Sequence, residues 1–400
     1  MMTALSMMLA MSAVSPSATS PQDGISECPF KMTDHAFIVD AMVNGKKVSL
    51  MFDTGFGAWV DVDDSINLGK PDGKMTLQDF VGTMEVDTVK IKSLKLGTLN
   101  IPLDESAQAV MSPNGGYSQA YGTHCDGLMG FSVIKNVVTE INFEKGKFIF
   151  YPKSYDITKK VPDNKKTFLT KLLPTGYSAV QMAVKTDQGK TMVLALDTGN
   201  SFYATTHKEV LDRVGLWPIT KKPSFMTSAG VASGVVDSWY IRMPKLSIFG
   251  VPVESSIWDV IDLPSSSSDS DGTVGYGFLK NFNIIIDYER RRVWLENFTG
   301  KVTDEEPAET GMSVYWDKAN KGYVVARVQG GGPADKAGVK RGDYLLSVDG
   351  DEAIDIGFDR MRTKLEGKPG SKVKVAMSRK GQLYRVEIER APLINDVTKN

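Results

Sequence analysis

The sequence predicts a mainly β chain of two similar β-barrel lobes followed by a small α+β domain. A segment that ends in Asp-Thr-Gly occurs twice, and 37 glycines separate many short runs rich in Val, Ile and Leu. Such runs are typical of strands joined by turns, and 400 residues exceed one ordinary core. We expect the lobes at residues 30–155 and 165–300, a linker at 301–310 and the final domain at 311–393.

Composition indicates a soluble globular protein, because 42% of the residues are hydrophobic and 24% are charged. The formal net charge is −1. Binding to nucleic acid or to an anionic membrane surface needs a basic excess, so we expect neither kind of partner. No Cys-x-x-Cys or His-Glu-x-x-His spacing occurs around the three histidines, so we expect no metal and no cofactor.

Residues 1–22 have the pattern of a secretory signal peptide. Residues 1–14 are apolar and uncharged, and residues 15–20 are small and polar. The apolar run is shorter than the about 20 residues that span a bilayer. We expect a secreted or periplasmic protein without an integral membrane segment; the alternative is a disordered tail. In an exported chain Cys28 and Cys125 either form one disulfide or remain separate thiols.

The repeat has two copies of one strand–turn–strand pattern. The first copy starts at Ala41 and ends in Asp53-Thr54-Gly55; the second starts at Met182 and ends in Asp197-Thr198-Gly199. Each has a glycine in its turn, which is typical of a hairpin. The alternative is that both triplets are ordinary turns after strands.

A second signature follows each triplet at a similar distance. After the first come Asp126-Gly-Leu-Met-Gly130 and an apolar hairpin at 138–150. After the second come Gly272-Thr-Val-Gly275 and an apolar hairpin at 284–295. Two copies of one β-fold account for both pairs together.

Two carboxylates that share one proton can catalyse hydrolysis without a metal. Like charges about 3 Å apart do not both ionise, so one pKa rises and the other falls. The ionised member can take a proton from water and the protonated member can give one to the leaving group. Gly55 and Gly199 permit close backbone approach. Thr54 and Thr198 can send their hydroxyls across to the opposite loop.

The chain resembles the pepsin-like aspartic peptidases, especially the bacterial members, over about residues 36–298. The resemblance rests on the two Asp-Thr-Gly triplets, the strands that end at Gly130 and Gly275, and the closing hairpins. It implies an aspartic endopeptidase of two pepsin-like lobes, with Asp53 and Asp197 as the catalytic pair at their interface. It also implies that the strands before Gly130 and Gly275 support the catalytic loops.

The chain departs from that family at two places. Phe56 and Asn200 follow the triplets where Ser, Thr or Ala is usual. Phe56 has no side-chain donor, while Asn200 or Ser201 can donate; fewer donors raise the pKa of the pair and predict activity nearer neutral pH. The hairpin expected to cover the cleft has no Tyr, so Phe80 or Met84 is expected to take that place. These departures leave open a second interpretation, a weak or inactive peptide-binding scaffold.

The last hundred residues resemble a PDZ domain of the bacterial arrangement. Residues 330–350 predict a turn, a short helix, a Gly-Asp turn and a strand; a helix is expected at 359–365 and a strand at 372–377. The resemblance implies that an extended peptide adds as a strand and that loop amides capture its C-terminal carboxylate; the alternative is a domain that only packs against the lobes. The residues expected to bind that peptide are Gly311, Met312, Ser313, Val314, Met361 and Leu365.

Overall fold

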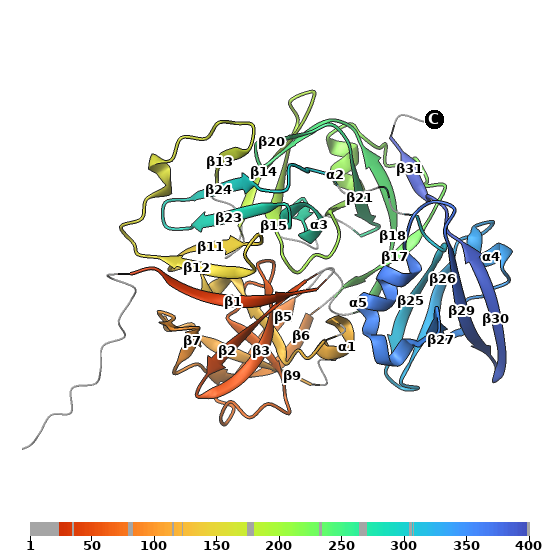
Figure 1. Cartoon of the computed structure of the whole chain (residues 1–400), viewed down its shortest axis with the longest axis horizontal. Helices are drawn as coiled ribbons and strands as arrows, with labels where there is room; N and C mark the ends of the chain where they lie inside the picture. The colour runs from red at the N-terminus through yellow and green to blue at the C-terminus, as the bar shows by residue number, and fades with distance from the viewer. Residues whose placement is uncertain are drawn as a thin grey trace, which may run out of the picture.

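The computed structural model describes residues 24–397 except 34–35, 79–82, 114–115, 122, 174–179, 232–233, 264–269, 304–305 and 307. In this part of the chain most regular structure is β, in three sheets with short helices between strands (Figure 1). The mainly β prediction is therefore confirmed. The expected signal peptide at 1–22 lies outside the described residues. We call residues 24–155 the first half and residues 167–303 the second half.

The first half lies in a 15-stranded sheet that also takes three strands from the second half. The turn between its second and third strands uses Asn44 and Gly45, both at positive φ (49° and 79°), as a two-residue hairpin requires. The strands are β1 (Ser26–Met32), β2 (Phe37–Val43), β3 (Lys46–Asp53), β4 (Val60–Asp63), β5 (Gly73–Gln78), β6 (Thr83–Lys90), β7 (Leu94–Leu96), β8 (Leu99–Asn100), β9 (Gln108–Ser112), β10 (Gly127–Gly130), β11 (Val138–Asn142), β12 (Lys147–Tyr151), β13 (Thr167–Lys171), β23 (Phe282–Asp287) and β24 (Arg292–Asn297).

The two closing hairpins join the halves into one sheet. Strand β11 pairs antiparallel with β23, with Thr139 opposite Ile286 and Ile141 opposite Ile284. All residues of both strands are buried, as expected for strands covered on both faces. One continuous apolar core accordingly runs through both halves, from Cys28 to Leu295.

The second half forms most of a 10-stranded sheet. Its strands are β14 (Gln181–Thr186), β15 (Thr191–Leu196), β16 (Ala204–His207), β17 (Thr227–Val231), β18 (Gly234–Met243), β19 (Leu246–Ile248), β20 (Val251–Val253), β21 (Ser256–Ile261), β22 (Gly272–Val274) and the C-terminal β31 (Ile394–Asp396). The short helices of the two halves are α1 (Tyr117–Tyr121), α2 (Lys208–Arg213) and α3 (Tyr276–Leu279), with 3-10 turns η1 (Phe131–Val133) and η2 (Ile157–Lys159).

The same strand connections occur in both halves. Strand β3 lies parallel to β10, and β10 lies antiparallel to β4. In the second half β15 lies parallel to β22, and β22 lies antiparallel to β16. Each Asp-Thr-Gly stands at the end of the first strand of such a trio, so the sequence repeat corresponds to a repeated arrangement of strands.

A separate C-terminal domain has its own sheet and its own apolar core. Its long helix bends at Gly357, whose φ of 74° is outside the helical range. The elements are β25 (Met312–Asp317), β26 (Gly322–Val328), α4 (Pro333–Lys336), β27 (Tyr344–Val348), β28 (Asp351–Glu352), α5 (Ala353–Leu365), β29 (Lys372–Arg379) and β30 (Gln382–Glu389).

Both ends of this domain are attached to neighbouring structure. At its start, Ala308 bridges Gly367 and Glu309 bridges Ala391, so these two residues of the expected linker 301–310 are paired within the domain. At its end, β31 pairs parallel with β18 of the second half. In Figure 1 the domain (blue) lies against the second half (green), with α5 beside α1 of the first half.

Two further expectations from the sequence concern the two cysteines and a membrane-spanning segment. Cys28 and Cys125 are buried free thiols and form no disulfide with each other. Burial raises the pKa of each thiol to about 11. Among the described residues no helix is long and apolar enough to cross a membrane.

Candidate functional site

The two Asp-Thr-Gly loops meet where the two halves touch. Asp53 is the last residue of β3, and Asp197 directly follows β15. Both strands are buried along their apolar ends, so the loops emerge from rigid parts of the core. The structure thus brings together the two aspartates that the sequence singled out.

Each aspartate is held by its own loop in the same way. Asp53 Oδ1 accepts hydrogen bonds from the backbone N–H of Gly55 (2.8 Å) and Phe56 (3.1 Å). Asp197 Oδ1 accepts them from Gly199 (2.9 Å) and Asn200 (3.1 Å). In both loops one carboxylate oxygen is fixed by backbone donors.

The glycine of each loop lies against the carboxylate of the other loop. A methyl group on Gly199 would stand 2.4 Å from Asp53 Cγ, and one on Gly55 would stand 2.7 Å from Asp197 Cγ. Carbon atoms without a bond between them do not approach so closely, so only glycine fits at either position. The two carboxylates therefore face each other across the boundary between the halves.

Two threonines lock the loops together. The Thr54 hydroxyl donates to the carbonyl of Leu196 and the Thr198 hydroxyl donates to the carbonyl of Phe52, both at 2.7 Å. Both threonine side chains are fully buried. Unpaired polar groups are costly at such a depth, so these bonds constrain the distance between the loops.

Burial and mutual repulsion change the protonation of the pair. Burial raises the pKa of Asp53 well above its usual value, and the charge of Asp197 raises it further. Burial also raises the pKa of Asp197, while hydrogen bonds from Asp53 and from the backbone of Gly199 and Asn200 oppose that rise. Both carboxyl groups therefore favour the protonated form more than an exposed aspartate does, and the two groups titrate as a coupled pair.

Such a pair can move protons in both directions. The ionised member can accept a proton, and the protonated member can donate one to a neighbouring carbonyl or amine. The arrangement is therefore chemically suited to hydrolysis or to binding a polar, neutral group such as a peptide bond.

The strands behind the loops also require glycine. A methyl group on Gly130 would lie 2.2 Å from the carbonyl oxygen of Ala58, and one on Gly275 would lie 2.2 Å from that of Phe202. Gly130 N–H donates to Trp59 and Gly275 N–H donates to Tyr203, both at 2.9 Å. The supporting role expected for the two strands stays a prediction.

The residues after the triplets are placed differently from expectation. The side chain of Asn200 donates to the hydroxyls of Thr205 (2.9 Å) and Thr273 (2.7 Å), and its backbone N–H reaches Asp197 instead. Ser201 Oγ accepts a hydrogen bond from Arg362 of the C-terminal domain at 2.7 Å. The backbone N–H groups already occupy Asp197 Oδ1, so the amide side chain turns to the strands behind the loop.

The hairpin expected to cover the cleft is formed by β5 and β6. Met84 lies in β6 opposite Leu77 and is 49% exposed. Phe80, the other candidate, lies outside the described residues. A covering role for either residue stays a prediction.

The predicted peptide groove of the C-terminal domain lies at a pocket between two domains. Strand β25 and helix α5 form one wall, and the second half forms the other. Met361 is fully buried in the domain core and does not line this pocket, and Gly311 lines a smaller neighbouring one. The pocket is lined by Ser201, Phe202, Thr227, Tyr240, Glu309, Thr310, Met312, Ser313, Val314, Phe358, Arg362, Leu365 and Glu366.

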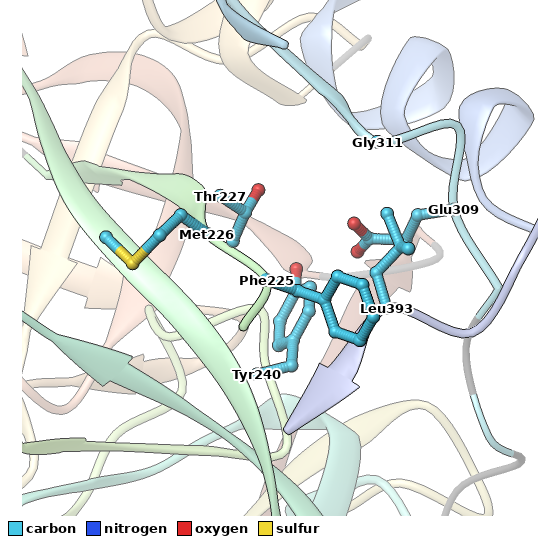
Figure 2. A pocket seen from close by; sticks show the side chains of 7 residues that line it. All are labelled: Phe225, Met226, Thr227, Tyr240, Glu309, Gly311 and Leu393. Atoms are coloured by element: carbon cyan, nitrogen blue, oxygen red, sulfur yellow. The ribbon is translucent and has the colours of Figure 1, made fainter. Parts of the chain in front are cut away.

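Figure 2 shows the smaller pocket, where Glu309 and Leu393 face Phe225 and Tyr240. Burial raises the pKa of Glu309 to about 8, and the charge of Glu366 adds to the rise. Sequence reasoning missed Tyr240, Glu309 and Arg362, because no local pattern signals contacts between residues so distant in the chain.

The histidines among the described residues are His124 and His207. His207 is buried beside the carbonyl of Leu263, and exposed His124 lies 3.4 Å from Asp126. Within the described ranges no three His, Cys, Asp or Glu side chains are grouped so as to hold a metal ion.

Comparison with known proteins identifies one domain. Residues 302–389 match the family model of the PDZ domain. The predicted PDZ domain is thus confirmed. The groove between β25 and α5 is a groove of this PDZ domain.

Some of the similar curated proteins are named as periplasmic proteases, and another is named for a binding partner. A "Probable periplasmic serine endoprotease DegP-like" of Rhizobium meliloti is 31% identical over 51% of this chain and 44% of its own length. One of Brucella suis is 31% identical over 27% of this chain and 20% of its own. Human Tax1-binding protein 3 is 33% identical over 19% of this chain and 60% of its own. The chain thus spans less than two thirds of these relatives.

One solved structure, the photosystem II D1 C-terminal processing protease, is 25% identical over 22% of this chain and 24% of its own. Its TM-score of 0.21 is too low to support an argument about the fold.

These relatives correct the predicted enzyme type. The sequence predicted an aspartic endopeptidase of the pepsin-like family, whereas the relatives named as endoproteases are of the serine type. The aspartic type and the pepsin-like assignment are therefore not supported. The prediction derived the type from the two Asp-Thr-Gly triplets, the strands that end at Gly130 and Gly275 and the closing hairpins, and such motifs fix a local geometry without fixing the attacking group of a reaction.

Proposed function

We propose that this chain hydrolyses peptide bonds in proteins that its PDZ domain binds, in the periplasm or outside the cell. The names of the similar DegP-like proteins support a periplasmic protease, and the PDZ match supports peptide binding. In this proposal residues 30–155 and 165–300 act as two lobes whose loops meet at the functional site.

The functional site in this proposal is the pair Asp53 and Asp197, taken as two buried carboxyl groups that contact the bound peptide and not as the attacking group of an aspartic-type enzyme. The single observation that carries it is the close approach of each loop's glycine to the opposite carboxylate. A methyl group added to Gly199 or to Gly55 would stand only 2.4 Å or 2.7 Å from the facing carboxyl carbon. Two buried carboxylates that repel each other destabilise a fold, so a purely structural role would favour neutral residues at these positions.

The PDZ domain supplies the substrate in this proposal. Strand β25 ends its sheet, so an extended peptide can pair with its outer edge. The segment Gly311–Val314, whose last three residues begin β25, borders the two pockets, and Leu365 offers an apolar wall. Protein C-termini are therefore the proposed partners of this groove.

The test is cleavage of a denatured, fluorescently labelled protein by the purified full chain. We expect wild type to cleave it, and Asp53→Asn and Asp197→Asn each to lose activity by at least about a hundredfold. Asp187→Asn, at an exposed position of a turn, is the matched control and should cleave like wild type. A serine-reactive fluorophosphonate is added in a parallel series.

The outcomes separate the two parts of the proposal. If the fluorophosphonate abolishes cleavage and both Asn variants stay active, the proposed functional site is wrong and the protease remains. If no protein is cleaved at any pH between 3 and 8, peptide hydrolysis itself is wrong.

A further inference from the structure

Arg362 of the PDZ domain reaches the loop that carries Asp197. Its Nη1 donates to Ser201 Oγ at 2.7 Å, and its guanidinium carbon lies 4.3 Å from the ring centre of Phe202. Its Nε donates to Glu366, the residue directly after the same helix, at 2.7 Å. The guanidinium is thus held both by its own domain and by the second half.

Three consecutive contacts join Arg362 to the functional site. Ser201 and Phe202 follow Asn200 directly, and Phe202 N–H donates to Asn200 Oδ1 at 2.9 Å. Asn200 N–H in turn donates to Asp197 Oδ1 at 3.1 Å. A displacement of Ser201 and Phe202 therefore acts on a donor that fixes the Asp197 carboxylate.

The same arginine lines the peptide groove. The pocket between β25 and α5 has apolar walls at Met312, Val314 and Leu365. Arg362 of α5 and Phe202 of the second half also line it and lie against each other. An apolar side chain that enters this pocket therefore touches both the groove and the Asp197 loop.

The positive charge of Arg362 determines how this residue responds to the C-terminus of a bound peptide. The occupant we infer, which rests on the proposed function, is an extended C-terminus with a free carboxylate and an apolar last side chain. Its carboxylate competes with Ser201 for the guanidinium, because charge-assisted hydrogen bonds to carboxylates are stronger than those to a hydroxyl. Binding then withdraws Arg362 from Ser201.

We propose that Arg362 is a positioning residue that couples occupancy of the PDZ groove to the position of the Asp197 loop. With the groove empty, Arg362 fastens Ser201 and Phe202 to helix α5. With a carboxylate-terminated peptide bound, the arginine turns to the peptide and the loop is released. The PDZ domain thereby regulates the functional site as well as binding substrate.

The experiment measures binding and loop protection separately in the full chain. The probes are a fluorescent hexapeptide that ends in Val with a free carboxylate, and the same peptide with an amidated end. Fluorescence anisotropy measures binding, and hydrogen–deuterium exchange measures the segment 197–203. We expect the free acid at saturation to speed exchange of this segment about threefold or more, and the amide to leave it unchanged.

Variants of one helix test the role of the arginine. In Arg362→Ala and Arg362→Lys we expect fast exchange of 197–203 without peptide and no further change when the free acid binds. Arg360→Ala, at an exposed arginine of the same helix, should respond like wild type. Thermal unfolding shows that each variant is folded before exchange is measured.

A failure of the proposed peptide groove can be distinguished from a failure of the proposed coupling. If the free acid does not bind wild type, the proposed peptide groove is wrong and the coupling with it. If it binds wild type but 197–203 exchanges as before, the coupling is wrong while the groove stands. Neither readout requires cleavage, so a failure of the proposed hydrolysis would leave this test intact.

Discussion

The backbone N–H of Thr54 donates to the hydroxyl of Thr198 at 3.1 Å, and the N–H of Thr198 donates to the hydroxyl of Thr54 at 3.0 Å. Each hydroxyl also donates to a strand carbonyl of the opposite half. The exchange is reciprocal and fully buried. The two carboxylates therefore keep their separation only as long as both threonine hydroxyls are present.

Removal of one hydroxyl is predicted to loosen the pair. Thr198→Val keeps the shape of the side chain but leaves the Thr54 N–H and the Phe52 carbonyl unpaired. Two buried groups without partners cost about 2–4 kcal/mol of unfolding free energy. Chemical denaturation monitored by tryptophan fluorescence measures this loss.

Thr198→Ser is the control for that substitution. It retains the hydroxyl and should lose less than about 1.5 kcal/mol, mainly through the missing methyl group. Equal losses in the valine and serine variants would contradict a role for the hydroxyl.

A methyl group at Gly199 is predicted to separate the carboxylates. It would stand 2.4 Å from Asp53 Cγ and 2.5 Å from both carboxylate oxygens, so Gly199→Ala must displace Asp53. We expect protein cleavage to fall by at least about a hundredfold. Gly330→Ala is the matched control, since nothing lies within 4 Å of its methyl group and its φ is not positive. Full activity of Gly199→Ala would show that the approach of the two loops is not needed.

The sequence could predict features that depend on a few neighbouring residues, such as a close backbone approach or a hairpin. Gly55 and Gly199 were singled out because only glycine permits close backbone approach, and the structure places each against a carboxylate. The same holds for the closing hairpins, whose apolar runs form β11, β12, β23 and β24. These features depend on a few consecutive residues.

Contacts between distant segments could not be predicted in this way. Ser201 and Arg362 are 161 positions apart, and neither has a pattern that names the other. Asn200 or Ser201 was considered as a side-chain donor to a carboxylate, but the strands behind Asn200 offer two hydroxyls that the sequence does not place nearby. The predicted enzyme type was wrong although several short motifs supported it, because such motifs fix local geometry and not the attacking group of a reaction.

The buried carboxyl group of Asp259 is predicted to make the stability of the protein depend on pH. Burial raises its pKa to about 7, and neither of its carboxylate oxygens has a hydrogen-bond partner among the described residues. The folded state therefore binds more protons than the unfolded state between about pH 4 and pH 7, and stability falls as pH rises through that window. The shift corresponds to at most about 4 kcal/mol lost by pH 8.

Asp259→Asn should remove this dependence. Relative to wild type, we expect the free energy of unfolding of the variant to rise by about 2–4 kcal/mol between pH 4 and pH 8. The reason is that the buried carboxyl group of wild type must ionise over this range, whereas Asn does not ionise. Urea denaturation at pH 4, 6 and 8 measures the difference. Asp187→Asn, which is exposed, should show no such trend. Parallel stability curves for wild type and Asp259→Asn would contradict a raised pKa.

Asn395 fastens the chain end to the second half and is predicted to keep the PDZ domain in register with the Asp197 loop. Its Oδ1 accepts from Ser224 N–H (2.7 Å) and Phe225 N–H (3.2 Å), and its Nδ2 donates to the carbonyls of Phe225 and Tyr240, both at 2.9 Å. The side chain is 4% exposed. Asn395→Ala leaves these backbone groups unpaired and should cost about 2–4 kcal/mol.

That loss should appear at the domain boundary before the global transition, because β31 is only three residues long and lies at the end of the chain. Limited proteolysis should then cut Asn395→Ala near residues 390–393 at least about five times faster than wild type. Asn395→Asp is the closer variant, since it keeps both acceptor bonds and loses the donors. If the alanine variant resists the protease as wild type does, β31 is not what holds the PDZ domain against the second half, and the contacts of Gln329 and Arg327 with Met226 and Asp237 must suffice.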